Sequence, residues 1–266
     1  MTELKYKLPE VRMTPIPRLA LGGRWRVEAM RSYSSNLLLW FTRGQGRITV
    51  AGTTRGYGAH NAVFIPSGVM HGFEVSTQVF GTAVFIPRDL GGALPSLPMH
   101  LRIRDAGPQS EVTGILDNLQ RELDGALPDR IRAAHHHTGL LTVWLNRQIL
   151  LHSEDSKAPD AAQRLTTRFT EMIEAQYQSG MNISQYAKAL GVTPTHLSRV
   201  CNQACGRPAS TLLNDRVIFE ARRLLKETKT PIQQVAAALG FTSPAYFTRA
   251  FQHHTGQTPS AFRRAR

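Results

Sequence analysis

A pattern that occurs twice near the end of the chain constrains the fold more than any other feature. The two copies span residues 183–206 and 232–256, and each contains a short apolar stripe followed by a glycine. The copies are offset by 49 residues at Gly191 and Gly240, and by 50 residues at Arg199 and Arg249. A repeat of this length is a supersecondary unit used twice. Each copy predicts a short helix, a glycine turn and a second helix, which is the helix-turn-helix layout.

Helix start signals are dense in this region. A capping hydroxyl stands directly before a proline at Thr193-Pro194, Thr230-Pro231, Ser243-Pro244 and Thr258-Pro259. A hydroxyl followed by proline suits the N-cap and the first helical position. Thr230 with Gln233 also fits a capping box, and Asn182 with Gln185 is a weaker signal of the same kind.

The second helix of each copy is predicted to be the element that reads DNA. Leu197, Val200, Phe247 and Phe251 are expected to point inward at helical spacing. The outward positions are expected to be Thr195, Ser198, Arg199, Asn202, Ala245, Tyr246, Thr248 and Arg249. Polar and arginine-bearing faces suit base edges in a major groove. A long helical pattern over residues 208–228 would hold the two reading helices at a fixed separation. Two successive major grooves on one face of the DNA are about 34 Å apart, so the two helices need about this separation.

Charge is concentrated in the same part of the chain. Residues 164–266 contain 14 Lys and Arg against 5 Asp and Glu, a net of +9 out of +13 for the whole chain. A basic segment of this kind is typical of a phosphate-binding surface. The alternative for Arg199 or Arg249 is a solvated side chain or an intramolecular salt bridge.

Residues 165–266 resemble the DNA-binding domain of the AraC/XylS family of bacterial transcription regulators. The residues that carry the resemblance are Ala187, Leu190, Gly191, Leu197, Arg199 and Gly206 in the first copy, and Ile232, Val235, Ala236, Leu239, Gly240, Phe241, Ser243, Tyr246, Phe247, Arg249, Phe251, Gly256, Pro259, Phe262 and Arg263 in the second. The family implies seven helices, two helix-turn-helix units in adjacent major-groove segments, and RNA polymerase as a partner. Its reading positions match Thr195, Ser198, Arg199, Pro244, Ala245, Tyr246, Thr248 and Arg249. Cys201 stands where family members often carry an aromatic residue, so looser packing is expected there.

The first part of the chain predicts a small β-barrel or jelly roll. Residues 1–20 predict an arm or an edge strand, and short apolar runs follow over residues 25–30, 36–42, 47–51, 62–65, 71–75 and 79–86, separated by glycines. Evenly spaced short strands with glycine turns favour such a fold. The segments Phe41-Thr-Arg-Gly-Gln-Gly-Arg-Ile-Thr-Val50 and Phe64-Ile-Pro-Ser-Gly-Val-Met-His-Gly-Phe73 resemble the cupin-type sensor domain of the same family.

A small-molecule effector pocket is expected in this barrel. Aromatic walls with a few polar groups suit such a pocket, and the candidates are Trp25, Arg31, Tyr33, Trp40, His71 and Phe73. An inward-facing arginine among Arg24, Arg26 and Arg31 would select an anionic effector, whereas arginines on a solvated strand face would not. Plain core packing is the alternative for the aromatic residues.

No metal site, catalytic residue or cofactor is predicted. Catalytic cupins usually hold a metal with a histidine and carboxylate cluster plus a later histidine, and only the later one, His71, is present. One histidine does not make a tight metal site. Cys201 and Cys205 are the only cysteines and are predicted to be buried thiols, with a redox switch as the alternative.

Two helical patterns separate the barrel from the repeat. Residues 88–107 are a Pro- and Gly-rich connection, residues 108–152 carry the helical pair, and residues 153–163 predict a polar linker. Such a pair is often an antiparallel dimer contact in the family, and the alternative is that both helices only cover the barrel. The domains are therefore expected at 1–107, 108–152 and 164–266.

The whole sequence predicts an α+β chain of two domains. No apolar run approaches the ~18–20 residues of a membrane span, and residues 1–10 lack a secretory apolar core, so the chain is expected in the cytoplasm, on the nucleoid. We expect a DNA-binding, effector-responsive transcription regulator, typically an activator, that is a homodimer. The alternatives are a metal-dependent cupin enzyme with a DNA-binding tether, and a regulator whose sensor domain has no ligand.

Overall fold

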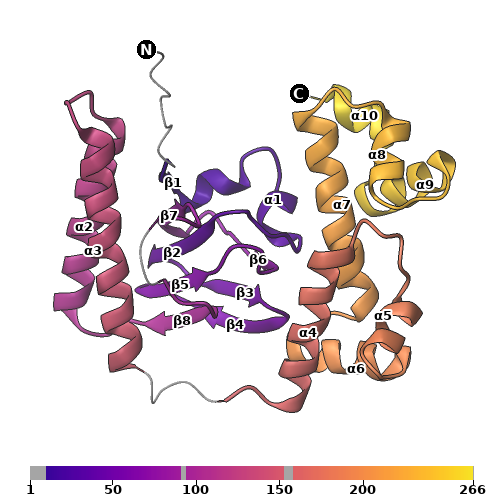
Figure 1. Cartoon of the computed structure of the whole chain (residues 1–266), viewed down its shortest axis with the longest axis horizontal. Helices are drawn as coiled ribbons and strands as arrows, with labels where there is room; N and C mark the ends of the chain where they lie inside the picture. The colour runs from indigo at the N-terminus through magenta and orange to yellow at the C-terminus, as the bar shows by residue number, and fades with distance from the viewer. Residues whose placement is uncertain (1–9, 91–93, 153–157, 266) are drawn as a thin grey trace, which may run out of the picture.

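The two-domain α+β organisation predicted from the sequence is confirmed. The computed structural model describes residues 10–90, 94–152 and 158–265. Two β-sheets lie in the middle of the molecule, a helical hairpin covers them on one side, and the C-terminal helices stand on the other (Figure 1). Residues 1–9 of the predicted arm and 153–157 of the predicted linker lie outside the described residues.

The N-terminal domain is built from two antiparallel sheets. The larger has the strand order β1 (Arg12–Pro15), β7 (Phe80–Ile86), β2 (Asn36–Arg43), β5 (Asn61–Ile65) and β8 (Met99–Arg102). The smaller has the order β4 (Thr53–Tyr57), β3 (Gly46–Val50) and β6 (His71–Phe73). Strand β1 lies at the edge of the larger sheet, as the sequence predicted for part of residues 1–20.

Alternation along β2 separates two apolar cores. Leu37, Leu39 and Phe41 pack between the sheets, whereas Leu38 and Trp40 point to the opposite face. Successive side chains of a strand point to opposite faces, so one strand can serve both cores. The second face is covered by helices α2 (Ala106–Asp124) and α3 (Arg130–Leu151).

The strand predicted over residues 25–30 is wrong. Trp25–Glu28 form a single helical turn, α1, which follows the 3-10 helix η1 (Ile16–Ala20). Gly22 and Gly23 precede the turn with φ of 87° and 128°, so the chain reverses there instead of extending. Val27 and Met30, three positions apart, are buried, which is a helical rather than an alternating spacing.

Two strands of the structure, β4 and β8, were not predicted from the sequence. Strand β4 has the sequence Thr-Thr-Arg-Gly-Tyr, which lacks the apolar alternation of the other strands. Strand β8 lies inside the connection assigned to residues 88–107. It pairs with β5, with Leu101 opposite Ala62.

The C-terminal domain contains helices α4 to α10. They are α4 (Ala161–Gln176), α5 (Ile183–Ala189), α6 (Pro194–Cys205), α7 (Ala209–Glu227), α8 (Ile232–Ala238), α9 (Pro244–Thr255) and α10 (Pro259–Arg264). One core packs α4, α5 and α6 against the start of α7, and a second packs α8 and α9 against its later part. The long helix α7 therefore joins the two repeat units (Figure 1).

Within the described residues, no helix is both long enough and apolar enough to cross a membrane.

Candidate nucleic-acid interface and effector residues

The first repeat unit is helix α5, a turn and helix α6. Asn182 and Gln185 form a reciprocal capping box at the start of α5, with Asn182 Oδ1 accepting from the Gln185 backbone N–H at 3.1 Å. Gly191 has a φ of 72°, which favours glycine, and it turns the chain toward α6. The Thr193 hydroxyl then accepts from the backbone N–H of His196 at 3.2 Å and caps α6.

The second unit repeats this arrangement with one difference. Gly240 turns the chain at a φ of 76°, and the Ser243 hydroxyl accepts from the Tyr246 backbone N–H at 3.3 Å, capping α9. The predicted cap at Thr230 is wrong, because Pro231 holds the N-cap position of α8 and no side chain caps that helix. The Thr230 hydroxyl instead accepts a hydrogen bond from the Thr228 hydroxyl, at 3.0 Å. The weaker of the two predicted capping boxes, at Asn182, is the one that forms.

The predicted reading residues of α6 lie mostly on its solvent side. Thr195, Arg199 and Asn202 are exposed, while Leu197, Val200 and Cys201 are buried beneath them. Ser198 is half-buried, and its hydroxyl accepts from the Ala209 backbone N–H at 3.4 Å. Ser198 thus faces the start of α7 as much as solvent.

The predicted reading residues of α9 are also accessible. Pro244, Ala245, Tyr246 and Arg249 are exposed, and Tyr246 retains 55% of its surface although it is aromatic. Thr248 is half-buried and donates its hydroxyl to the Pro244 carbonyl at 2.9 Å. The ring of Tyr246 packs against that of Phe241, with ring centres 5.8 Å apart, and its remaining surface is open to solvent.

Neither reader arginine is tied up in an ion pair with a described residue. Among the described residues, Arg199 forms one side-chain hydrogen bond, to His196, with Nη2 at 3.2 Å from Nδ1. His196, exposed and three positions before Arg199 on the same helix face, was missed by sequence analysis. The i, i+3 spacing from the arginine was the available signal.

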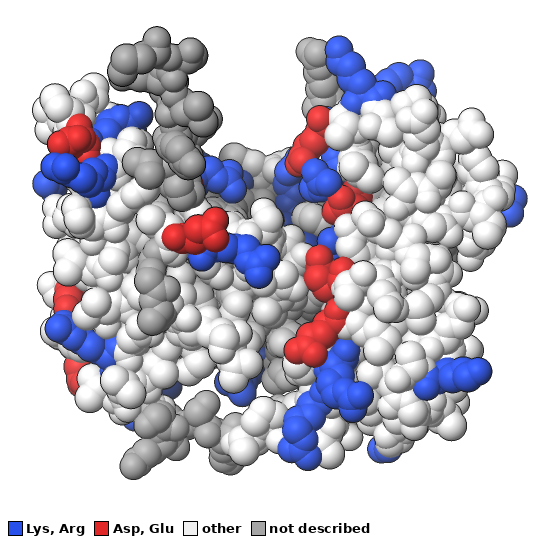
Figure 2. Space-filling model, viewed as in Figure 1, with Lys and Arg blue, Asp and Glu red and all other residues white. Residues whose placement is uncertain are grey.

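Many of the other cations of this domain are used internally. Arg216 is 5% exposed and forms two hydrogen bonds with the Glu174 carboxylate, at 2.7 and 3.1 Å. Arg223 contacts both Glu220 and Glu227, and Arg207 contacts Asp215. In Figure 2, acidic and basic groups gather along the edge of the C-terminal domain that faces the sheets. These three arginines are therefore not free to contact phosphates.

The two cysteines are buried near the end of α6. Burial raises the pKa of the Cys201 thiol to about 12, and the Cys205 thiol has a raised pKa for the same reason. Both thiols therefore remain protonated at neutral pH, and a thiol reacts through its thiolate. Cys201 packs with Leu197 in the core of the first unit.

Four of the six predicted effector residues lie together. Arg31, His71 and Phe73 are each at most 2% exposed. The ring of Tyr33 is 5.2 Å from that of His71, and the Arg31 guanidinium stands 5.3 Å from the rings of Tyr33 and Phe73. Burial, followed by the nearby Arg31 charge, lowers the pKa of His71 to about 3.

The other two lie elsewhere. Trp40 points to the opposite face of its sheet and packs against Trp144 of α3, with ring centres 6.1 Å apart. The side chain of Trp25 points toward the C-terminal domain. Its ring packs edge-on against Phe219 of α7 and Phe262 of α10, with ring centres 5.8 and 6.0 Å apart. Trp25 does not lie between the two sheets, because the segment that carries it is a helical turn rather than a strand.

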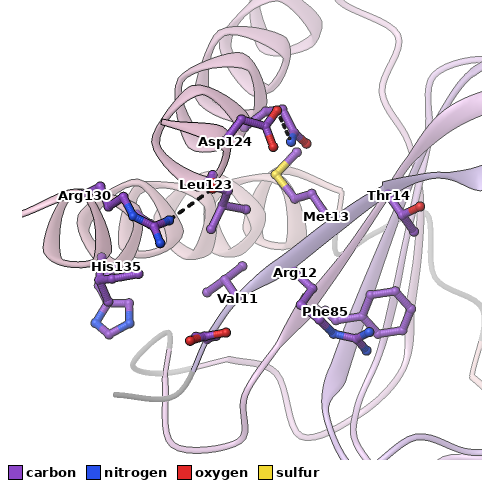
Figure 3. A pocket seen from close by; sticks show the side chains of 13 residues that line it. Val11, Arg12, Met13, Thr14, Phe85, Leu123, Asp124, Arg130 and His135 are labelled. Atoms are coloured by element: carbon purple, nitrogen blue, oxygen red, sulfur yellow. Dashed lines mark hydrogen bonds between the residues drawn. The ribbon is translucent and has the colours of Figure 1, made fainter. Parts of the chain in front are cut away.

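A surface pocket of about 390 Å³ lies between β1 and the α2–α3 hairpin (Figure 3). Met13 and Leu123 form part of its apolar wall, and Arg130, whose Nη1 donates to the Leu123 carbonyl at 3.1 Å, stands at its side. The six predicted effector residues, all in the described part of the chain, do not line it.

Over residues 10–90, 94–152 and 158–265, no group of three or more His, Cys, Asp or Glu side chains is placed to hold a metal ion. His71 and the run His135–His137 stand in separate elements, β6 and α3.

The C-terminal domain has two helix-turn-helix units, α5–α6 and α8–α9, joined by the long helix α7, which is the architecture of a double helix-turn-helix DNA-binding domain. A helix-turn-helix domain family model matches residues 186–265. The probable transcription factor PqrA of Proteus vulgaris is 31% identical over 104 residues, which cover 38% of this chain and 85% of that protein. This chain belongs to the AraC/XylS family of transcription regulators.

For longer relatives, the aligned region covers a smaller share of the relative's own length. The arabinose operon regulatory protein of Salmonella typhimurium is 28% identical over 153 residues, which cover 53% of this chain and 52% of that one. The chain spans about half or less of the length of the first curated relatives that it matches. The structure of ToxT from Vibrio cholerae O395 aligns over 96% of both chains at 10% identity and a TM-score of 0.45, and adds nothing to the family assignment.

Proposed function

We propose that this protein is a sequence-specific regulator of transcription that reads two adjacent major-groove segments of double-stranded DNA with α6 and α9. The observation that carries the proposal is the pair of capped helices, joined by α7, whose exposed faces present Arg199 and Arg249 without an acidic partner among the described residues. An arginine in this state can grip a guanine through two hydrogen bonds. Backbone N–H groups at helix starts and the remaining free cations supply contacts to phosphates.

Selection of binding sites from random duplex DNA tests this proposal. The wild-type chain is expected to enrich a motif with two conserved blocks, and the double variant Arg199→Ala/Arg249→Ala is expected to enrich none. Lys188→Ala, on helix α5 outside the predicted readers, serves as the control, and we expect it to weaken all sequences about equally. Enrichment of the same motif by the double variant contradicts the assignment of the readers.

The proposal includes a ligand-responsive N-terminal domain. The domains are assigned to residues 1–107, 108–152 and 164–266, with a cupin-like jelly roll first and a seven-helix DNA-binding domain last. The cluster of Arg31, Tyr33, His71 and Phe73 supports binding of a small-molecule effector, because it combines aromatic walls with buried polar groups. The family habit supports an activator in the cytoplasm, on the nucleoid, with RNA polymerase as a partner. A metal-dependent cupin enzyme is not favoured by any observation of the described residues.

The proposal also includes a homodimer formed through α3. Leu140, Val143 and Leu151 recur at spacings of three and eight on one face of α3, and they retain 53%, 45% and 73% of their surface. Exposed apolar side chains along one helix face are typical of a helix–helix interface.

Light scattering on the full chain at micromolar concentration tests the dimer. We expect a mass of twice 29.6 kDa for the wild type and of 29.6 kDa for Leu140→Asp/Val143→Asp. Ala126→Asp, an exposed change in the loop before α3, should leave the dimer intact. A monomeric wild type would remove this part of the proposal.

A further inference from the structure

Arg31 is a buried cation whose hydrogen bonding is incomplete. It is 0% exposed, its Nη1 donates to the carbonyls of Val27 and Ala29 at 2.6 and 3.4 Å, and its Nε donates to the Tyr33 hydroxyl at 2.9 Å. Its Nη2 has no partner, and no described carboxylate forms an ion pair with it. Burial of a guanidinium without a paired anion costs free energy. Binding of an anionic ligand beside Arg31 would lower this cost.

His71 presents a complementary atom beside it. The backbones of Arg31 and His71 are hydrogen-bonded to each other in both directions, at 2.9 and 2.7 Å. His71 Nδ1 lies 2.9 Å from the Val69 carbonyl, and because a carbonyl only accepts, Nδ1 must carry the proton. Its depressed pKa keeps the ring neutral, so Nε2 is an acceptor, and it too is buried without a partner.

The two unpartnered atoms have opposite requirements. Arg31 Nη2 needs an acceptor and favours a negative one, while His71 Nε2 needs a donor. A carboxylate satisfies the first and a hydroxyl group the second. The rings of Tyr33 and Phe73, whose centres lie 5.3 Å from the Arg31 guanidinium, make the surroundings of these two atoms apolar, which favours a ligand with a short carbon skeleton. These requirements together describe a small hydroxy-carboxylate.

The same arginine also holds the element that contacts the DNA-binding domain. Val27 and Ala29, whose carbonyls accept from Arg31, end the helical turn α1. Trp25 at the start of α1 packs on Phe219 of α7, and the Arg222 guanidinium stands 4.9 Å from its ring. Figure 1 shows α1 on the side of the sheets that faces α7.

We propose that Arg31 and His71 form the recognition site of a small hydroxy-carboxylate effector, and that α1 relays its binding to the DNA-binding domain. This inference rests on the proposed effector-responsive function. The carboxylate accepts from the unpartnered Nη2, and it draws the guanidinium away from the Val27 and Ala29 carbonyls that accept from Nη1, because a charged acceptor makes the stronger hydrogen bond. Loss of the hydrogen bonds from Arg31 to these two carbonyls makes the end of α1 more mobile. The packing of Trp25 against Phe219 of α7 is weakened as a result.

Thermal unfolding of the full chain at constant ionic strength tests the recognition site. The probes are lactate, which has both groups, propionate, which has only the carboxylate, and 2-propanol, which has only the hydroxyl. Lactate is expected to raise the melting temperature with a half-maximal concentration at least threefold below that of propionate, and 2-propanol should not raise it. A wild type that is not stabilised by either carboxylate overturns the proposal and leaves an ordered water as the occupant of the site.

Variants assign the effect to particular atoms. Arg31→Gln should lose the response to both carboxylates, Arg31→Lys should keep a weaker one, and His71→Ala should respond equally to lactate and propionate. Arg24→Gln is the matched control, because Arg24 is exposed and stands just before α1. A full lactate response in Arg31→Gln overturns the site, and the circular dichroism spectrum of each variant establishes that it folds.

Hydrogen exchange tests the relay. With lactate, backbone amides of α1 and of α7 near Phe219 should exchange faster, and Trp25→Ala should produce the same change without lactate. Unchanged exchange in α7 contradicts the relay even if lactate stabilises the chain. Binding of the wild type to its selected DNA is measured separately, so failure of the proposed function is distinguished from failure of this inference.

Discussion

Individual side chains decide where this chain can bind DNA and where it cannot. Arg199 and Arg249 occupy matching positions of α6 and α9 and are exposed, whereas Arg216 and Arg31 are buried. The same residue type thus has three environments: an exposed position on a predicted reading face, an internal ion pair, and a buried position without a described counter-ion. Only the surroundings distinguish them.

At the scale of one residue, His71 makes stability depend on pH. Its pKa of about 3 in the folded protein lies below its ordinary value of 6.5, so the unfolded chain binds more protons. This contribution to stability is complete above pH 6.5 and is lost as the pH falls toward 3, by at most about 1.4 kcal/mol per pH unit.

Chemical denaturation between pH 7 and pH 5 measures this slope. We expect the wild type to lose stability over this range, and His71→Gln to lose less. His100, whose pKa is lowered to about 4 mainly by burial, contributes a similar slope, so His71→Gln should retain part of the effect. Equal slopes in the two proteins would show that His71 is not buried as a neutral ring.

The sequence predicted that Arg199 and Arg249 are exposed, but it named Arg31 only as one of three arginines of which one could face inward. The apolar spacing of Leu197, Phe247 and Phe251 fixes which face of each helix is inward, and the arginines follow from it. Arg31 could not be placed in this way, because its burial depends on carbonyl groups at the end of α1 and on a partner strand, β6. These contacts are made by tertiary structure and leave no periodic signal.

Among the elements, α7 organises the DNA-binding domain. Its Arg216 forms a bidentate ion pair with Glu174 of α4 and a further contact with Glu220, and its guanidinium stands 3.8 Å from the ring of Tyr177. A bidentate pair fixes orientation as well as distance. The network therefore fixes the orientation of α7 relative to α4.

Removal of one partner should destabilise the domain. Glu174→Gln leaves a largely buried cation without its strongest contact, and loss of one partner of such a pair costs on the order of 3 kcal/mol. Urea unfolding of the full chain measures the change. Glu171→Gln, an exposed change one turn earlier on α4, is the control and should alter stability by less than about 0.5 kcal/mol.

Element prediction succeeded where the signal is local. Glycine turns, N-caps and apolar spacing identified the helices of both repeat units and most of the strands. It failed at residues 25–30, where the apolar residues suggested a strand. Two glycines with positive φ and the contact of Trp25 with α7 make it a helical turn. The deciding contact joins residues almost two hundred positions apart, which sequence periodicity does not report.

At the scale of the whole molecule, the N-terminal domain packs directly against the helices of the C-terminal domain. Trp25 contacts Phe219 of α7 and Phe262 of α10, while the Thr54 hydroxyl of β4 donates to the Cys205 carbonyl at the end of α6, at 3.2 Å. Gly52 approaches α4 so closely that a side-chain carbon there would lie 2.3 Å from Thr166 Cγ2. The N-terminal domain thus contacts α6 of the first unit directly, whereas its contact near the second unit is made with α7 and α10.

The central claim is that α6 and α9 read two adjacent major-groove segments together, and footprinting on the selected site tests it most directly. The wild type should protect two patches on one face of the duplex, about 10 base pairs apart. Arg199→Ala should weaken one patch and Arg249→Ala the other, each with a loss of roughly 1–3 kcal/mol in binding. A single protected patch, or two patches that both variants leave unchanged, would contradict the claim.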